Sequence, residues 1–190
     1  MVTLNKIYTK TGDGGETGIG DGSRVSKLDQ RIIAGGSVDE TNSLLGVAAA
    51  HCDCEKTTGI LATIQQRLFD LGADITCPWD PDAEEDRCPR IAARHIKWLE
   101  NEIDRVNGDL EPLKSFILPG GTHLAASLHV ARSVCRRAEI DVLRFQQETA
   151  INPQIAVYLN RLSDFLFVAA RAANDGGKSD VLWESDKTEV

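Results

Sequence analysis

Apolar side chains recur every three or four residues between positions 124 and 142, which is the spacing of one face of an α-helix. Four other segments repeat this period, and no segment shows the two-residue alternation typical of a strand. Amphipathic helices bury their apolar faces against one another, which predicts an all-α, antiparallel five-helix bundle. The predicted helices span about 29–52, 55–76, 91–106, 122–148 and 153–173.

The chain length fits a single domain over residues 1–190. Within it we expect a glycine-rich loop over 1–28, the helical bundle over 29–175 and a tail over 176–190. Residues 77–90 contain three prolines and five acidic side chains, which predicts a surface connection between the second and third helices.

Composition excludes several classes of protein. The net charge of −8 argues against non-specific nucleic-acid binding. The sequence contains no run of eighteen apolar residues, so we expect no membrane span. The first residues lack the apolar core of a secretion signal. The five cysteines are irregularly spaced, and the Cys52–Cys54 pair has no partner motif for zinc, so no metal ligands are assigned. We therefore expect a cytoplasmic protein with five reduced thiols.

The fourth predicted helix carries a charged stripe beside its apolar seam. Arg132, Arg136 and Glu139 follow one another at steps of four and three, and Arg137 lies a further 100° round the helix. One interpretation is a structural network of ion pairs on a solvated face. The other is a polyanion site, because arginine forks suit phosphate oxygens.

Residues 6–24 hold six glycines together with hydroxyl and lysine side chains. We expect no stable helix or strand there. The segment is either a flexible tail or a phosphate-binding loop, since glycine lets the backbone turn its N–H groups inward. The side chains that favour the second interpretation are Thr9, Lys10, Thr11 and Thr17.

Polar stripes also follow two other predicted helices. Asp39 and Asn42 belong to the stripe of the first helix, and Asn160, Asp164 and Arg171 form that of the fifth. The second and third helices carry none. This asymmetry predicts that the first, fourth and fifth helices border one site.

An apolar triplet, Phe116-Ile117-Leu118, precedes Pro119-Gly120-Gly121 between the third and fourth helices. Proline and glycine keep this stretch out of a helix. The triplet is either a hydrophobic plug on the end of the bundle or an apolar wall for a large flat ligand.

Six segments, taken in order, resemble those of the PduO-type ATP:cob(I)alamin adenosyltransferases, and the resemblance covers about residues 6–175. It implies a homotrimeric five-helix bundle with active sites between neighbouring subunits. ATP is then expected between the N-terminal loop of one subunit and the arginine-bearing helix of its neighbour. The segments are TKTGDGGETG, RVSK, VDETNSLLG, FILPGG, ARSVCRRAE and YLNRLSDFLFVAAR.

The resemblance also implies residue roles. Asp39 and Arg132 match a pair expected to form a salt bridge across the subunit interface, and Phe116 matches the aromatic that presses on the lower face of the corrin. Together with Arg136 these residues are the expected catalytic set. The expected ATP-binding set is Thr9, Lys10, Thr11, Gly12, Thr17, Lys27, Arg136, Arg137, Glu139 and Asn160.

Three positions depart from the family pattern. Gly35 and Thr41 stand where an aromatic and a Leu or Ala are common, and Ile140 replaces a frequent arginine. These departures concern packing and phosphate contacts and leave the core motifs whole.

The implied reaction is attack of cob(I)alamin on the ribose C5′ of ATP, with triphosphate as the leaving group. It needs no protein base, so we assign no role to the four histidines. The implied cofactors are ATP as co-substrate, Mg²⁺ and cob(II)alamin or cob(I)alamin. A flavin-dependent reductase and an adenosylcobalamin-dependent mutase are the implied partners. A trimer of this fold that binds nucleotide or corrinoid without turnover, or a purely structural trimer, is the alternative.

Overall fold

The computed structural model describes residues 7–20, 22–82 and 88–185. Residues 1–6 of the predicted N-terminal loop and 186–190 of the predicted tail lie outside this description. Within the described residues, no helix combines the length and the apolarity needed to cross a membrane.

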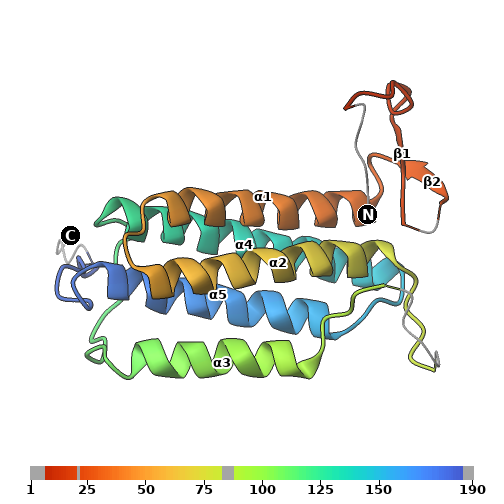
Figure 1. The fold of residues 1–190 in the computed structure, drawn as a ribbon. Coiled ribbons are helices and arrows are strands. Elements are labelled where there is room, and N and C mark those ends of the chain that lie inside the picture. The colour runs from red at the N-terminus through yellow and green to blue at the C-terminus, as the bar shows by residue number, and fades with distance from the viewer. Residues whose placement is uncertain (1–6, 21, 83–87, 186–190) are drawn as a thin grey trace, which may run out of the picture.

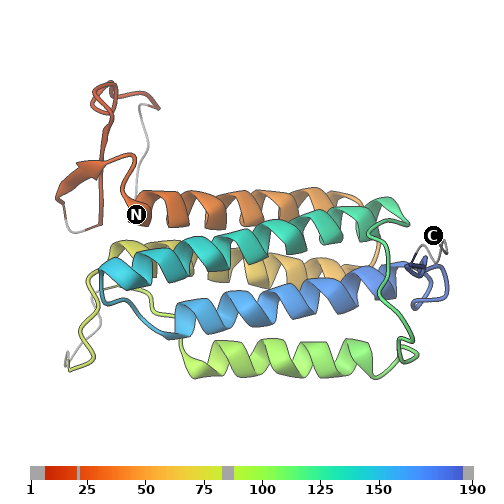
Figure 2. The same ribbon diagram turned by 180° about the vertical axis from the view of Figure 1, so that it is seen from behind.

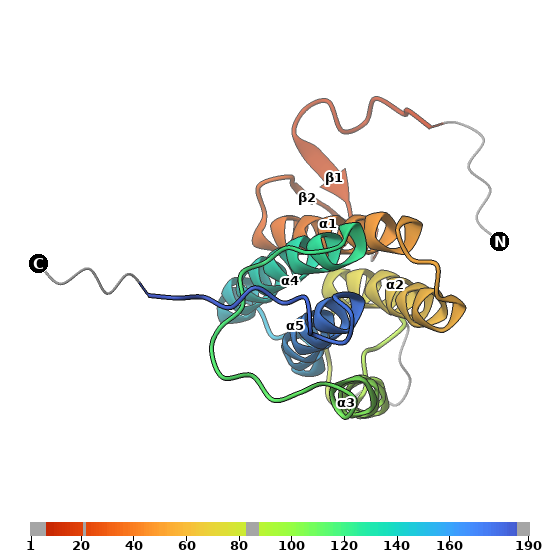
Figure 3. The same cartoon turned by 90° about the vertical axis from the view of Figure 1, so that its left-hand side faces the viewer.

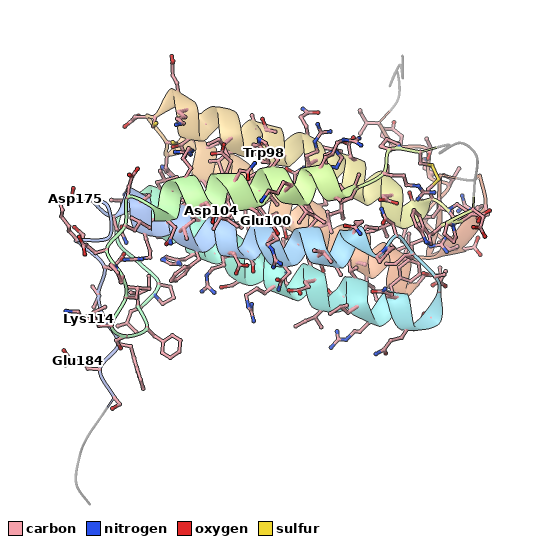
Figure 4. The ribbon with its side chains drawn as sticks, turned by 90° about the horizontal axis from the view of Figure 1, so that it is seen from below. Trp98, Glu100, Asp104, Lys114, Asp175 and Glu184 are labelled. Carbon is pink, nitrogen blue, oxygen red and sulfur yellow. A yellow bond between two sulfur atoms is a disulfide. The ribbon has the colours of Figure 1, made fainter. Side chains whose placement is uncertain are left out.

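Five helices form an antiparallel bundle, as the sequence predicts (Figure 1). The first, second, fourth and fifth helices pack around a common core, and the third lies outside, against the fifth (Figure 3). Figure 4 shows Trp98, Glu100 and Asp104 on this outer helix. The helices are α1 (Gln30–Ala50), α2 (Glu55–Thr76), α3 (Ala93–Asn107), α4 (His123–Glu148) and α5 (Gln154–Ala173).

Side-chain caps fix where two helices begin. The Asp29 side chain accepts from the backbone N–H of Arg31 at 2.8 Å at the start of α1. At the start of α4, the Thr122 hydroxyl accepts from the backbone N–H of Ala125 at 3.1 Å. Each cap satisfies a backbone donor that the first turn leaves unpaired.

The predicted apolar seams form the core. Leu45, Leu68, Leu128 and Leu159 are each at most 1% exposed, and they come from four different helices. Burial at this spacing is what holds the bundle together.

The third helix begins two residues later than predicted. The backbone N–H of Ile91 donates to the Asp74 carboxylate at 2.8 Å, which holds Ile91 outside the helix. Asp74 also accepts from Arg90 at 2.6 Å and from Asn152 at 2.7 Å. The buried carboxylate is therefore fully paired, and we interpret this cluster as structural.

The prediction that residues 6–24 contain no strand is wrong. Strands β1 (Glu16–Gly18) and β2 (Arg24–Ser26) form an antiparallel hairpin, in which Thr17 pairs with Val25. Gly22 adopts a φ of +85° in the turn, so the glycines that argued against a strand instead permit the hairpin. Figure 2 shows the hairpin projecting from the bundle beside the start of α1.

The prediction of five reduced thiols is also wrong. Cys77 and Cys88 form a disulfide that closes the connection between α2 and α3, with Cα atoms 6.5 Å apart. Cys52, Cys54 and Cys135 are free. The pairing depends on how close Cys77 and Cys88 come in the fold, which the spacing of cysteines does not reveal.

Candidate functional site

The arginine face of α4 lines a groove against α5. A cavity of about 380 Å³ lies there, bounded by Arg132 and Arg136 of α4 and by Asp164 and Phe167 of α5. The predicted polar stripes of these two helices therefore meet. Two cationic side chains at one cavity make it suited to a ligand that carries negative charge.

Arg132 is the most constrained of these cations. Among the described residues, its buried Nε atom has no hydrogen-bond partner and Arg132 forms no ion pair. Burial, and secondly the nearby charge of Arg136, lower the pKa of Arg132. A partly buried cation without a counter-ion is costly, so this geometry calls for an anion from a ligand or a second subunit.

Glu139 and Asn160 connect the same two helices. The Asn160 side-chain amide donates to the Glu139 carboxylate at 3.2 Å, and its oxygen accepts from Arg161 at 2.9 Å. The structure thus brings together two residues that the sequence assigned to ATP binding.

Arg137 points to the other side of α4. It forms an ion pair with Glu40 of α1, and about half of each side chain is exposed. An exposed pair of this kind contributes little to stability, so Arg137 remains accessible to a competing anion.

Asp39 does not reach Arg132 within one chain. Asp39 is exposed on α1. The contact between its neighbour Glu40 and Arg137 places Asp39 more than one helical turn from Arg132 along the antiparallel pair. An Asp39–Arg132 salt bridge would therefore need two copies of the chain, and it stays a prediction.

Lys27 lies against the glycine-rich loop. A Cβ atom at Gly12 would sit 3.2 Å from the Lys27 ammonium nitrogen, and the backbone N–H of Lys27 donates to the Gly15 carbonyl at 2.8 Å. The hydroxyls of Thr9 and Thr11 are 2.9 Å apart in the same loop. The loop therefore carries hydroxyl groups and lies against an ammonium.

Of two further predicted loop residues, Lys10 is exposed and Thr17 is half-buried. Lys10 has a φ of 62°, which bends the chain sharply at that position, and Thr17 lies in β1. The loop stands at the end of the bundle opposite the Phe116 segment (Figure 1).

Phe116 is 78% exposed, which excludes a buried plug. It borders a second cavity of about 450 Å³, which also includes Arg132, His129 and Phe167. Its ring meets the edge of Trp183 at a centroid distance of 6.4 Å. This geometry favours the second interpretation of Phe116, an aromatic wall for a flat ligand.

Two residues of this region were missed from the sequence. His129 is 3% exposed, and neither ring nitrogen has a hydrogen-bond partner in the part of the chain that the structure describes. Burial, and secondly the charge of Arg132, lower its pKa. Phe167 lines both cavities. The signal was present, because His129 precedes Arg132 by three positions and Phe167 follows Asp164 by three, so each extends a polar stripe that we identified.

No three His, Cys, Asp or Glu side chains are grouped to hold a metal ion in the part of the chain that the structure describes. A Mg²⁺ ion commonly takes only one or two carboxylates from the protein and the rest from substrate phosphates and water.

A helical bundle with two arginines at one cavity, an aromatic wall at a second cavity and a glycine-rich loop has the features expected of a protein that binds an anionic ligand next to a flat apolar one. The family model for cobalamin adenosyltransferase matches residues 7–173. The chain belongs to this family.

Relatives match over nearly the whole chain. A corrinoid adenosyltransferase of Mycobacterium leprae is 46% identical over 187 residues, covering 96% of this chain and 97% of the relative. One from Mycobacterium tuberculosis is 47% identical over 190 residues, covering 96% and 94%.

A solved structure shares the fold. It is a Phe-to-Ala variant of a PduO-type ATP:corrinoid adenosyltransferase from Lactobacillus reuteri complexed with cobalamin and ATP. It is 39% identical to this chain, with a TM-score of 0.87, and the match covers 95% of this chain and all of the other.

Proposed function

We propose that this chain transfers the 5′-deoxyadenosyl group of ATP to cob(I)alamin, giving adenosylcobalamin and triphosphate. One observation carries the proposal most directly. Arg132 borders both the arginine groove and the aromatic cavity, and its buried Nε atom has no hydrogen-bond partner among the described residues. A reaction that joins a polyanionic nucleotide to a flat corrinoid needs two such neighbouring surfaces.

In the proposed reaction the cobalt electron pair forms a bond to C5′ of the ribose. The bond between C5′ and its oxygen breaks, and the electron pair leaves with the triphosphate. The protein must align the two reactants and stabilise the charge that develops on the leaving group. Arg136 and Arg137, with Lys10 and Lys27 from the loop, carry the positive charge for this task.

Phe116 is proposed to cover the lower face of the corrin. An apolar side chain there excludes the lower axial ligand of cobalt and eases reduction of cob(II)alamin. Mg²⁺, when bound with ATP, supplies further neutralisation of phosphate charge.

The proposed assembly is a homotrimer with its active sites at subunit interfaces. Within one copy, the glycine-rich loop and the Phe116 segment lie at opposite ends of the helical bundle (Figure 1). A neighbouring copy that brings its loop to the arginine groove would complete the site. Asp39 of one copy would then supply an anion to Arg132 of its neighbour.

The wider setting of the reaction is also proposed. A flavin-dependent reductase is the class of enzyme that would supply the electron for cob(I)alamin. An adenosylcobalamin-dependent mutase would use the product. A cytoplasmic location would bring these partners together.

The test compares two arginine variants of α4. Arg136→Ala removes a cation of the groove, whereas Arg144→Ala removes an arginine of the same helix that is 64% exposed and pairs with Asp141. With MgATP and pre-reduced cob(I)alamin, adenosylcobalamin formation should fall by about a hundredfold or more in the first variant and stay near wild type in the second.

Two results would contradict the proposal. Equal activity in the two variants would remove Arg136 from the site. A wild-type protein that binds ATP and cobalamin but forms no adenosylcobalamin would be the catalytically inactive binding trimer.

A further inference from the structure

The chain after α5 returns to the Phe116 segment and pairs with it like a strand. The backbone N–H of Leu118 donates to the Val181 carbonyl at 2.8 Å, and that of Trp183 donates to the Phe116 carbonyl at 2.7 Å. The Ser115 hydroxyl adds a bond to the Trp183 carbonyl at 2.9 Å. The tail therefore fixes the backbone on which the exposed Phe116 ring stands.

The paired segments 115–118 and 181–183 lie at one end of the bundle. Lys114 and Glu184, which flank the paired residues, lie together at the outer end of the pairing in Figure 4. Figure 3 shows the α3–α4 connection and the chain after α5 at this same end. Two short segments without a helix of their own need an anchor to hold one position.

A buried ion pair provides the anchor. The Arg171 Nε atom lies 2.9 Å from the Asp180 carboxylate, and the two side chains are 6% and 2% exposed. Arg171 also donates to the Glu111 carbonyl at 3.0 Å. One arginine of α5 therefore holds both the tail and the α3–α4 connection.

Asn174 ties the same segments together. Its side-chain oxygen accepts from the Thr122 backbone N–H at 3.1 Å. Its amide nitrogen donates to the Gly120 carbonyl at 3.2 Å and to the Asp180 carboxylate at 3.1 Å. The Asn174 side chain thus links the α3–α4 connection, the start of α4 and the tail.

Two glycines make room for this network. Gly121 has a φ of +103°, and a Cβ atom there would lie 2.0 Å from the Asn174 side-chain oxygen. Gly177 has a φ of +84°, and a Cβ atom would lie 2.9 Å from Arg171. Both positions therefore require glycine for conformation and for space.

We propose that Arg171, Asn174 and Asp180 are positioning residues for the corrinoid, because they hold the tail against the 115–118 segment and so fix Phe116 before the corrinoid binds. The inference rests on the proposed function. An exposed aromatic ring keeps a productive position only if its backbone is held, and a displacement of about 1 Å can cost up to about a hundredfold in rate.

The charge of Asp180 also affects a residue of the Phe116 cavity. Burial and the charge of Arg132 lower the pKa of His129, and the carboxylate of Asp180 opposes this shift. Asp180 therefore acts on a side chain that lines the same cavity as Phe116. The competing interpretation is that the ion pair only stabilises the end of the bundle.

The test compares the same substitution, Asp to Asn, at two positions of the segment that follows α5. Asp180→Asn weakens the buried pair, whereas Asp175→Asn alters an exposed acid where the chain leaves α5 (Figure 4). We expect the KM for cob(I)alamin and the Kd for cob(II)alamin to rise about tenfold in Asp180→Asn. The KM for ATP should change less than about twofold, and the control should match wild type.

Three results would overturn the inference. The two variants could behave alike. Asp180→Asn could lower the melting temperature while cobalamin binding stays unchanged. It could also raise the KM values for ATP and cob(I)alamin equally, which would indicate a general loss of structure.

A second pair of variants covers the case in which Asp180→Asn does not fold. Trp183→Pro removes the N–H donor to Phe116, whereas Trp183→Ala loses the ring and keeps that donor. The ion pair is intact in both. Weaker cob(II)alamin binding in the proline variant than in the alanine variant supports the positioning role, and equal binding overturns it.

These binding measurements also separate the two proposals. If wild type binds cob(II)alamin but makes no adenosylcobalamin, the proposed function fails while the variant comparison still tests the positioning role. If wild type binds no cobalamin, both proposals fail.

Discussion

Truncation of Phe116 separates a structural role from a chemical one. The Phe116 side chain is 78% exposed, so only about a fifth of its ~200 Å² surface is buried against the rest of the protein. Phe116→Ala loses only this buried area. At ~25 cal/mol per Å² this is about 1 kcal/mol of unfolding free energy. Phe165 is 1% exposed, and Phe165→Ala is the structural control, with an expected cost of ~3–5 kcal/mol.

Melting curves and two activity assays read out this prediction. Phe116→Ala should melt within a few degrees of wild type, whereas Phe165→Ala should fall by roughly 6–20 °C. Phe116→Ala should lose most of its activity when the reaction starts from cob(II)alamin and much less when it starts from cob(I)alamin. Equal loss from both cobalt states, with a large drop in melting temperature, would refute the reasoning.

Three further predictions concern assembly, the loop and pH. Asp39→Ala and Arg132→Ala should each weaken trimerisation and activity, and a double-mutant cycle by sedimentation should show coupling; additive effects would refute the pairing. Proteolysis between Lys10 and Arg24 should slow when MgATP is added, and an unchanged cleavage rate would count against ordering of the loop by nucleotide. Because the folded-state pKa of His129 is lowered, the unfolded state binds more protons as pH falls below about 6.5, so unfolding free energy should decline there. Denaturant titrations should show a smaller decline in His129→Gln, and an identical pH dependence would contradict this assignment.

The bundle could be predicted because helix packing repeats a simple pattern. Burial of Leu128 and Leu159 follows from the spacing of apolar residues, and the start of α4 follows from the Thr122 cap. The meeting of Glu139 with Asn160 was foreseen only in outline, from polar stripes on two helices.

Features that depend on the path of the connections were not predictable. The Cys77–Cys88 pair needs the folded α2–α3 connection, and the β-hairpin needs the turn around Gly22. The sequence predicts only a tail over 176–190, yet Asp180 in that tail is anchored by a side chain of α5. These contacts join segments whose separation in sequence carries no periodic signal.

The most direct test of the proposed reaction is to identify the leaving group. MgATP and cob(I)alamin are incubated with the protein, and phosphorus NMR is recorded beside the absorbance of the cobalamin. Attack at C5′ predicts one intact triphosphate for each adenosylcobalamin formed, and neither product without the protein. Release of orthophosphate or diphosphate as the primary product, or triphosphate without adenosylcobalamin, would contradict the account.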